Sequence, residues 1–173
     1  MATVGFPDGI EGRHTGHHRN IVVSALPLLG LAAILAAALL GLFGGTGANE
    51  FHSDGPEGEL SARVPSTLRS GIFFEMEIAV QARRDIKEAT IAVSPELWRN
   101  VTINTVLPQA SKETFKGGLL HLGYGLLRAG ESIEIRIDGQ INPNLFLGNH
   151  GQIAFFNGNR KLLTIPVHFT VLP

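Results

Sequence analysis

Apolar residues follow two different patterns along the chain, and the change from one to the other divides it. From Ile21 to Phe43 the sequence is continuously apolar, carries no charge and has Ser24 as its one polar side chain. From Glu59 onward, apolar and polar residues alternate in short segments. A long uncharged apolar run is typical of a membrane-spanning helix, whereas alternation with period two is typical of strands with one buried face. The pattern predicts a single transmembrane helix followed by one all-β domain.

The alternation is clearest in Ile72–Ala82, where every even position is apolar and Glu75, Glu77 and Gln81 lie between them. The same alternation marks further segments at 61–64, 89–93, 101–106, 120–124, 133–137, 153–156 and 162–172. No helical pattern of about ten residues lies among them. About seven or eight short strands separated by turns predict an antiparallel β-sandwich with an immunoglobulin-like layout.

Turn residues and prolines refine this prediction. Asn157-Gly158 favours the positive φ angles of a tight hairpin turn between the last two strands. Pro65 and Pro166 lie in or beside predicted strands, and proline cannot donate a hydrogen bond to a neighbouring strand. We therefore expect both prolines at sheet edges or bends.

Charges on either side of the apolar run predict its orientation. Arg13 and Arg19 precede it, whereas Glu50, Asp54 and Glu57 follow it before the next basic residue. Because basic residues resist translocation, the amino terminus is expected in the cytoplasm and the large domain outside it, at an inner or plasma membrane. A cleaved signal peptide is the alternative, although the apolar region of a signal normally runs only about 7 to 15 residues.

The predicted organisation has four parts: a disordered tail at 1–20, a transmembrane helix at 21–43, a flexible linker at 44–58 and a β-sandwich at 59–173. The linker prediction rests on its glycines and acidic residues. In the tail, His14, His17 and His18 are interpreted as a polar flank of the span rather than as a metal site.

Small residues recur every four positions within the apolar run, at Ala33, Ala37, Gly41 and Gly45. In a helix this spacing forms one face on which another membrane helix can approach closely. The alternative is that an alanine-rich segment produces the spacing by chance.

Composition excludes several kinds of chemistry. The chain has 0 Cys, so disulfides, thiolate metal sites and cysteine nucleophiles are absent. Its net charge is -1 and residues of both signs are interspersed, so the sequence shows no basic patch of the kind that binds nucleic acid. No nucleophile, base and oxyanion signature accompanies the serines, and no cofactor-binding motif is present, so we do not expect an enzyme.

The strand layout, with a Gly-Leu-Leu-Arg-Ala-Gly-Glu-Ser turn at 125–132 before the strand at 133–137, resembles bacterial immunoglobulin-like or fibronectin-III-like extracytoplasmic modules. The resemblance covers roughly residues 60–173. The chain differs from immunoglobulin domains in lacking their Cys pair and the associated placement of a Trp. The resemblance implies a binding or spacing module, and a fold of this type does not by itself define a function.

One connection carries more apolar side chains than a solvated loop favours. Within Asn142–Gly151, Leu145, Phe146 and Leu147 are consecutive, and together with Trp98 they are the candidate partner contacts. The alternative is that Leu145 and Leu147 cap the end of the sandwich, or that a short strand runs there.

The leading functional hypothesis is a single-pass membrane protein whose domain is an accessory or assembly subunit that recognises another envelope protein. The alternative is an extracytoplasmic sensor or carrier that binds a ligand or a metal through His121, His150 and His168. A metal would require these three imidazoles to converge.

Overall fold

The computed structural model describes residues 21–42 and 47–173, and its contacts divide the chain into two compact units, Met1–Leu42 and Phe43–Pro173. In the first unit, helix α2 spans Ile21–Leu39 and contains Pro27. The predicted tail at 1–20 and the predicted packing residue Gly45 lie outside the described residues. Within the part of the chain that the structure describes, no helix is both long and apolar enough to cross a membrane.

Helix α2 ends earlier than Phe43 because a glycine closes it. Gly41 has a φ of 73° and donates its N–H to the carbonyl of Ala38 at 3.0 Å. The N–H of Leu42 donates to the carbonyl of Ala37, also at 3.0 Å. This pair of bonds is a Schellman cap, in which a left-handed glycine satisfies the last carbonyls of a helix. Gly41 therefore lies in the cap of the helix and does not continue its surface stripe.

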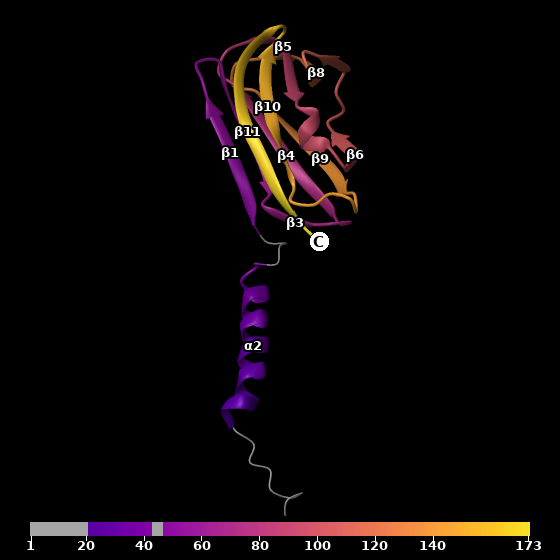
Figure 1. The fold of residues 1–173 in the computed structure, drawn as a ribbon. Helices are drawn as coiled ribbons and strands as arrows, with labels where there is room; N and C mark the ends of the chain where they lie inside the picture. Colours follow the sequence, from indigo (N-terminus) through magenta and orange to yellow (C-terminus); the bar gives the residue numbers. More distant parts are fainter. Residues whose placement is uncertain (1–20, 43–46) are drawn as a thin grey trace, which may run out of the picture. The chain divides into compact units, whose positions relative to one another are not determined.

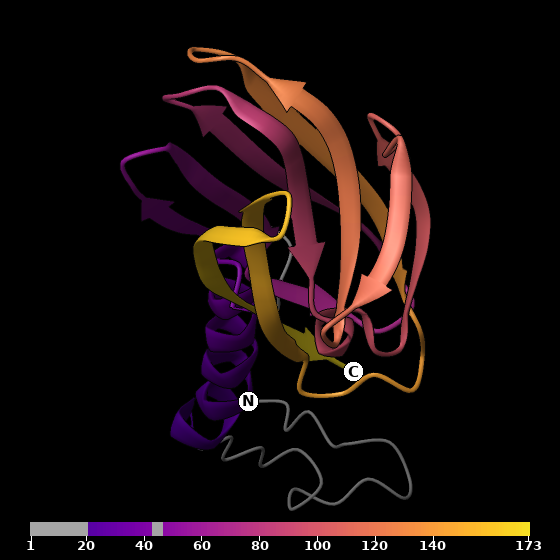
Figure 2. The ribbon, with the colours of Figure 1, turned by 90° about the horizontal axis from the view of Figure 1, so that it is seen from above.

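The second unit consists of two packed β-sheets (Figures 1 and 2). The first has the order β1-β2-β4-β9-β6, and the second the order β3-β11-β10-β5-β8-β7. The strands are β1 (Ala48–Asp54), β2 (Gly58–Pro65), β3 (Thr67–Arg69), β4 (Phe73–Ala82), β5 (Ile86–Val93), β6 (Val101–Leu107), β7 (Lys112–Lys116), β8 (Leu119–Leu127), β9 (Ser132–Ile141), β10 (Asn149–Asn157) and β11 (Arg160–Leu172), and a 3₁₀ helix, η1, covers Pro95–Trp98. The predicted β-sandwich is confirmed.

Three strands were not predicted, and one of them corrects the linker assignment. Strand β1 occupies Ala48–Asp54, inside the segment 44–58 that was predicted to be a flexible linker. Its composition is polar, but it pairs in antiparallel register with β2, from Ala48 opposite Pro65 to Asp54 opposite Glu59. Backbone pairing against an existing strand stabilises β1, so its side chains carry little strand signal of their own.

The sandwich contains one parallel pair, between β3 and the last residues of β11. Because β3 contacts only Thr170–Leu172, the earlier part of β11 pairs with β10 alone. Pro166 lies in that part, opposite Gln152, so its missing N–H leaves no interstrand bond unmade. Although β11 lies between β3 and β10 in the strand order, β10 is its one paired neighbour at Pro166, so this position is a local edge.

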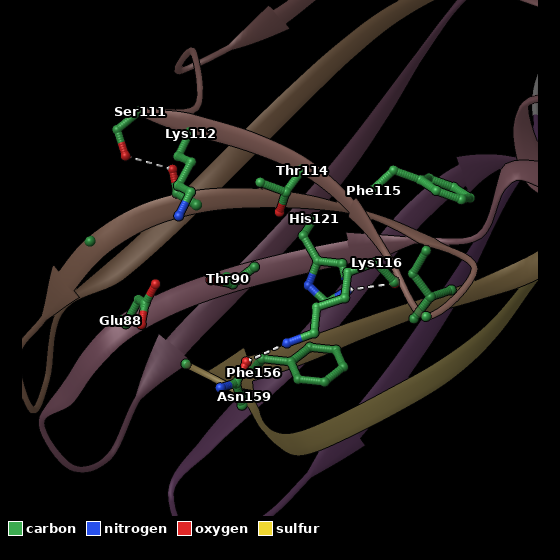
Figure 3. Close-up of a pocket in the computed structure, with 15 residues that line it drawn as sticks. Glu88, Thr90, Ser111, Lys112, Thr114, Phe115, Lys116, His121, Phe156 and Asn159 are labelled. Atoms are coloured by element: carbon green, nitrogen blue, oxygen red, sulfur yellow. Dashed lines mark hydrogen bonds between the residues drawn. The ribbon is translucent and has the colours of Figure 1, made fainter.

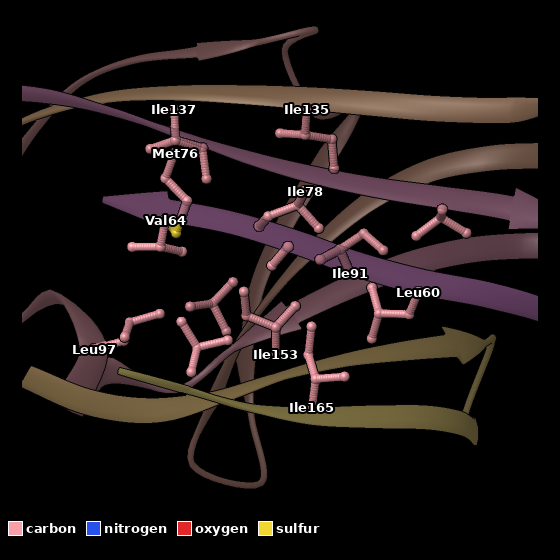
Figure 4. Packing of buried hydrophobic residues seen from close by; sticks show 14 of the residues in the cluster. Leu60, Val64, Met76, Ile78, Ile91, Leu97, Ile135, Ile137, Ile153 and Ile165 are labelled. Atoms are coloured by element: carbon pink, nitrogen blue, oxygen red, sulfur yellow. The ribbon is translucent and has the colours of Figure 1, made fainter. Parts of the chain in front are cut away.

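Alternating side chains from both sheets meet in one core (Figure 4). Met76 and Ile78 of β4 and Ile135 of β9 are at most 3% exposed, as their period-two pattern predicts. They face residues of the second sheet such as Ile153 and Ile165, which are 0% and 1% exposed. Each such side chain contributes about 1.5–3 kcal/mol through its removal from water, so the contact between the sheets is the main source of stability.

We expect Ile78→Ala to lower the free energy of unfolding by about 2–5 kcal/mol, because it leaves a cavity where Ile78 is 0% exposed. The matched control is Phe73→Ala on the same strand, where the side chain is 71% exposed and a change within about 0.5 kcal/mol is expected. Denaturant unfolding followed by tryptophan fluorescence measures both. Equal losses for the two variants would contradict the assignment of the buried face.

Candidate functional site

The connection between β9 and β10 divides its apolar residues between the core and the surface. Leu145 is 3% exposed and belongs to the core, as the capping interpretation predicts for that residue. Phe146 and Leu147 point the other way, with 58% and 89% of their surface exposed. We call residues 142–148 the apolar loop. The loop thus exposes the apolar side chains of Phe146 and Leu147, while the buried side chain of Leu145 anchors it to the core.

Hydrogen bonds to three other segments hold the apolar loop in place. The N–H of Asn142 donates to the carbonyl of Asn100 at 3.0 Å, and the hydroxyl of Ser70 donates to the carbonyl of Pro143 at 3.0 Å. The N–H of Leu147 donates to the carbonyl of Val171 at 3.2 Å. The loop is therefore a fixed surface feature, and its order does not depend on Phe146 or Leu147 being covered.

The backbone of the loop is strained at the residue that is most exposed. Leu147 has a φ of 69°, in the left-handed region that costs a non-glycine residue about 1–2 kcal/mol. Gly148 follows with a φ of 101°, and a Cβ there would lie 1.9 Å from the carbonyl oxygen of Phe169. Only glycine fits at 148, and this close approach determines the direction of the turn that projects Leu147 outward.

The remaining candidate partner contact, Trp98, lies elsewhere. It ends η1, is partly buried and packs against the core. Its indole Nε1 is buried and has no hydrogen-bond partner among the described residues. Nearby, the buried Asn149 donates its amide to the carbonyls of Leu97 at 3.1 Å and Arg99 at 2.6 Å, which fixes η1 against β10. Trp98 thus acts as packing beneath this end of the sandwich.

The three histidines of the metal hypothesis do not form one group. His150 and His168 lie directly opposite each other on β10 and β11 and are exposed. The ring of His168 contacts Phe51 edge-on at 5.2 Å. His121 lies on β8 instead, pairs with Ala92 of β5 and is half-buried. Across the described residues, no group of three or more His, Cys, Asp or Glu side chains could hold a metal ion.

His121 lines a groove on the outer face of the second sheet, a feature that the sequence pattern did not reveal (Figure 3). The groove has a volume of about 630 Å³. Strands β5, β7 and β8 and the turn between β10 and β11 contribute its lining, which comprises Glu88, Thr90, Ser111, Lys112, Thr114, Phe115, Lys116, Gly117, Leu119, His121, Gly123, Gly125, Phe156, Gly158 and Asn159. It combines polar side chains with the aromatic ring of Phe156. We call it the outer groove.

Several contacts fix the walls of the outer groove. The Lys116 ammonium donates to Oδ1 of Asn159 at 2.8 Å, and Nε2 of His121 lies 3.2 Å from the carbonyl oxygen of Lys116. The rings of His121 and Phe156 are 5.1 Å apart. These contacts tie the β7–β8 hairpin to the β10–β11 hairpin across the sheet (Figure 3).

Tyr124 lies on the inner face of β8, the strand that also carries His121. Its hydroxyl is buried and has no hydrogen-bond partner among the described residues. Burial, together with the nearby carboxylate of Glu113, raises the pKa of Tyr124 to about 12. The cause is that a phenolate would lose its hydration and meet a like charge.

Comparisons with known proteins identify no family for this chain. No family model matches the sequence, and no curated protein matches it. Among solved structures, the chain is similar to a non-cellulosomal cohesin from the hyperthermophilic archaeon Archaeoglobus fulgidus, at a TM-score of 0.39 and 14% identity over 64% of this chain and 88% of that one. It is also similar to CaCohA2 from Clostridium acetobutylicum, at a TM-score of 0.43 and 13% identity over 65% of this chain and 88% of that one.

A third solved structure, a β-glucuronidase from glycoside hydrolase family 2, is similar at a TM-score of 0.34 and 12% identity. That similarity covers 72% of this chain but 11% of the enzyme. The class of protein that the strand order defines is a two-sheet β-sandwich.

The single tyrosine of the chain makes the Tyr124 pKa directly measurable. We expect the absorbance of tyrosinate to rise with a midpoint near pH 12, above the ordinary value of 10.0. Since the folded-state pKa is raised, the contribution of Tyr124 to stability is present below pH 10 and is lost as the pH rises toward 12. In Glu113→Gln the midpoint should fall part of the way, because burial remains. A midpoint at the ordinary value in the folded protein would contradict the burial of this hydroxyl.

Proposed function

We propose that this chain is a non-catalytic, single-pass membrane protein whose immunoglobulin-like sandwich lies outside the cytoplasm and binds another envelope protein. The observation that carries the proposal is the exposed pair Phe146 and Leu147, at 58% and 89% exposure, on a loop that hydrogen bonds hold in place. Both side chains are available to a partner without rearrangement. A contact surface that is already ordered loses little conformational entropy on binding.

The strain at Leu147 supports a role in binding. An exposed leucine gains nothing from folding, and a left-handed leucine costs about 1–2 kcal/mol relative to glycine at the same position. The remaining structure therefore holds an apolar side chain outward at an energetic cost. Backbone strain of this kind concentrates at functional sites, where binding can recover it.

The apolar loop lies at the end of the sandwich where the chain enters it. The N–H of Ser66 donates to the carbonyl of Gly47, just before β1, at 2.8 Å. The carbonyl of Ser66 in turn accepts from the N–H of Thr170 at 3.0 Å, next to the Val171 carbonyl that holds Leu147.

The membrane anchor is proposed from the apolar segment itself. Helix α2 has no charged residue, and its leucines are exposed on all sides within its own unit, as at Leu26, Leu28, Leu29, Leu31, Leu35 and Leu39. A helix that is apolar all round requires an apolar environment. Ala33 and Ala37 of the predicted packing stripe lie in this helix, and they favour a second membrane helix as neighbour.

We expect Phe146→Ser and Leu147→Asn each to reduce recovery of a specific partner at least about tenfold, since a buried apolar anchor contributes 1.4 kcal/mol or more. The measurement is mild crosslinking in native membranes, capture on a carboxy-terminal tag and quantitative mass spectrometry. Phe115→Ser is the matched control, because Phe115 is 67% exposed but lies on β7.

Loss of folding does not account for the expected result at Leu147. Asparagine adopts the left-handed conformation more readily than leucine, so the thermal stability of Leu147→Asn should equal or exceed that of the parent. Equal recovery of the same proteins by the parent and by both loop variants would refute the apolar loop as the contact surface.

The anchor has its own test in membrane fractionation. We expect the full chain to remain in the membrane pellet after alkaline carbonate, and Leu31→Arg with Leu35→Arg to move it to the supernatant, because each central charge costs about 2.5–3.5 kcal/mol. Phe146→Ser should stay in the pellet. Full release of the parent chain by carbonate would contradict the anchor while leaving partner capture by the sandwich open to measurement.

A further inference from the structure

The outer groove is a concavity that strand register builds across four strands. Residue pairing places Lys112 of β7, Gly123 of β8, Thr90 of β5 and Phe156 of β10 in one row across the sheet. Lys112 and Phe156 stand at the two ends of this row, with a glycine and a threonine between them. Large side chains at the ends of a row and small ones in its centre produce a groove.

Glycines make the floor of the groove open. A Cβ at Gly125 would meet no atom within 4 Å, and Gly125 has a φ of 80°, which favours glycine. At Gly123 a Cβ would approach only Lys112, at 3.4 Å from its carbonyl oxygen and 3.6 Å from its Cβ. The centre of the groove is therefore free space bordered by strand backbone rather than a gap filled by neighbouring side chains.

Two charged side chains of opposite sign face this space without partners. Among the described residues, neither the Lys112 ammonium nor the Glu88 carboxylate makes a hydrogen bond or an ion pair, and both line the groove (Figure 3). Lys116, in contrast, is engaged by Asn159, whose amide nitrogen remains available as a donor. The groove thus offers one cation, one anion, an amide donor and the hydroxyls of Thr90 and Thr114.

We propose that the outer groove binds a short saccharide that carries a carboxylate. The ammonium of Lys112 would pair with the sugar carboxylate, and the carboxylate of Glu88 would accept hydrogen bonds from neighbouring sugar hydroxyls. The ring of Phe156 provides an apolar surface for the C–H face of a sugar ring. The volume of about 630 Å³ lies within the usual 300–1,000 Å³ of small-molecule sites.

The same geometry disfavours an extended peptide as the occupant. A peptide that binds to a sheet gains affinity from main-chain hydrogen bonds to a free strand edge. In the floor of the groove, β8 is paired with β5 on one side and β7 on the other, so its main-chain groups serve these ladders. Recognition in the groove must come from side chains, which suits the hydroxyl-rich surface of a saccharide.

The test is isothermal titration calorimetry of the full chain in a detergent without a sugar headgroup. The probes are trigalacturonate, the neutral trisaccharide maltotriose and an acidic peptide of alternating Glu and Gly. We expect trigalacturonate to bind with a Kd on the order of 1 mM or tighter, and at least about tenfold more tightly than either of the other probes.

Three variants locate the site. Gly123→Val fills the floor at a strand position without positive φ, so it should keep the fold and abolish binding. Lys112→Ala should weaken trigalacturonate binding about tenfold and affect maltotriose little. Lys161→Ala, which removes an exposed lysine outside the lining, should change neither.

Three results would overturn the proposal: no heat of binding with trigalacturonate, tighter binding of the acidic peptide, or binding that persists in Gly123→Val with a thermal melt like that of the parent. The proposal is independent of the partner surface. Leu147→Asn should bind trigalacturonate as the parent does, so failure of one proposal is distinguishable from failure of the other.

Discussion

The contact between the inner faces of the two sheets is the constraint on which the other features depend. Strands β4 and β9 pair along most of their length, from Phe73 opposite Gln140 to Gln81 opposite Ser132, and form the centre of the first sheet. Because strand side chains alternate between faces, one register places Met76, Ile78 and Ile137 in the core and their neighbours in solvent. A shift of one residue would exchange the two faces, so the core determines which side chains remain available on the outside.

Both candidate sites are consequences of this arrangement. In the apolar loop, burial of Leu145 and the close approach of Gly148 to Phe169 leave Phe146 and Leu147 no position but an outward one. In the outer groove, strand pairing places Gly123, which has no side chain, beside Lys112. The larger side chains of Lys112 and Phe156 form the two sides of the groove. The loop depends on a strained turn at one end of the sandwich, whereas the groove depends on pairing across a sheet face.

Period two in the sequence was sufficient to predict the eight strands whose alternate residues enter the core. It was insufficient for β1, β3 and β7, because backbone pairing places these segments at sheet edges and few of their side chains are buried. The end of α2 was misplaced for a related reason: Gly41 belongs to an apolar run, but its left-handed φ of 73° closes the helix. The outer groove was not predicted because its residues are far apart in the sequence and are brought together only by strand pairing.

The two candidate surfaces differ in the polarity of the side chains that they expose. At the apolar loop, Phe146 and Leu147 offer area without hydrogen-bonding groups, and such a surface gains free energy by excluding water from a large complementary partner. In the outer groove, Lys112, Glu88 and Asn159 offer directed hydrogen bonds around a small volume, and such a site selects by chemistry rather than by area. A large apolar partner that fits the apolar loop is poorly suited to the outer groove. A small polar ligand that fits the outer groove is poorly suited to the apolar loop. The two candidate surfaces therefore suit different kinds of occupant and do not form one extended interface.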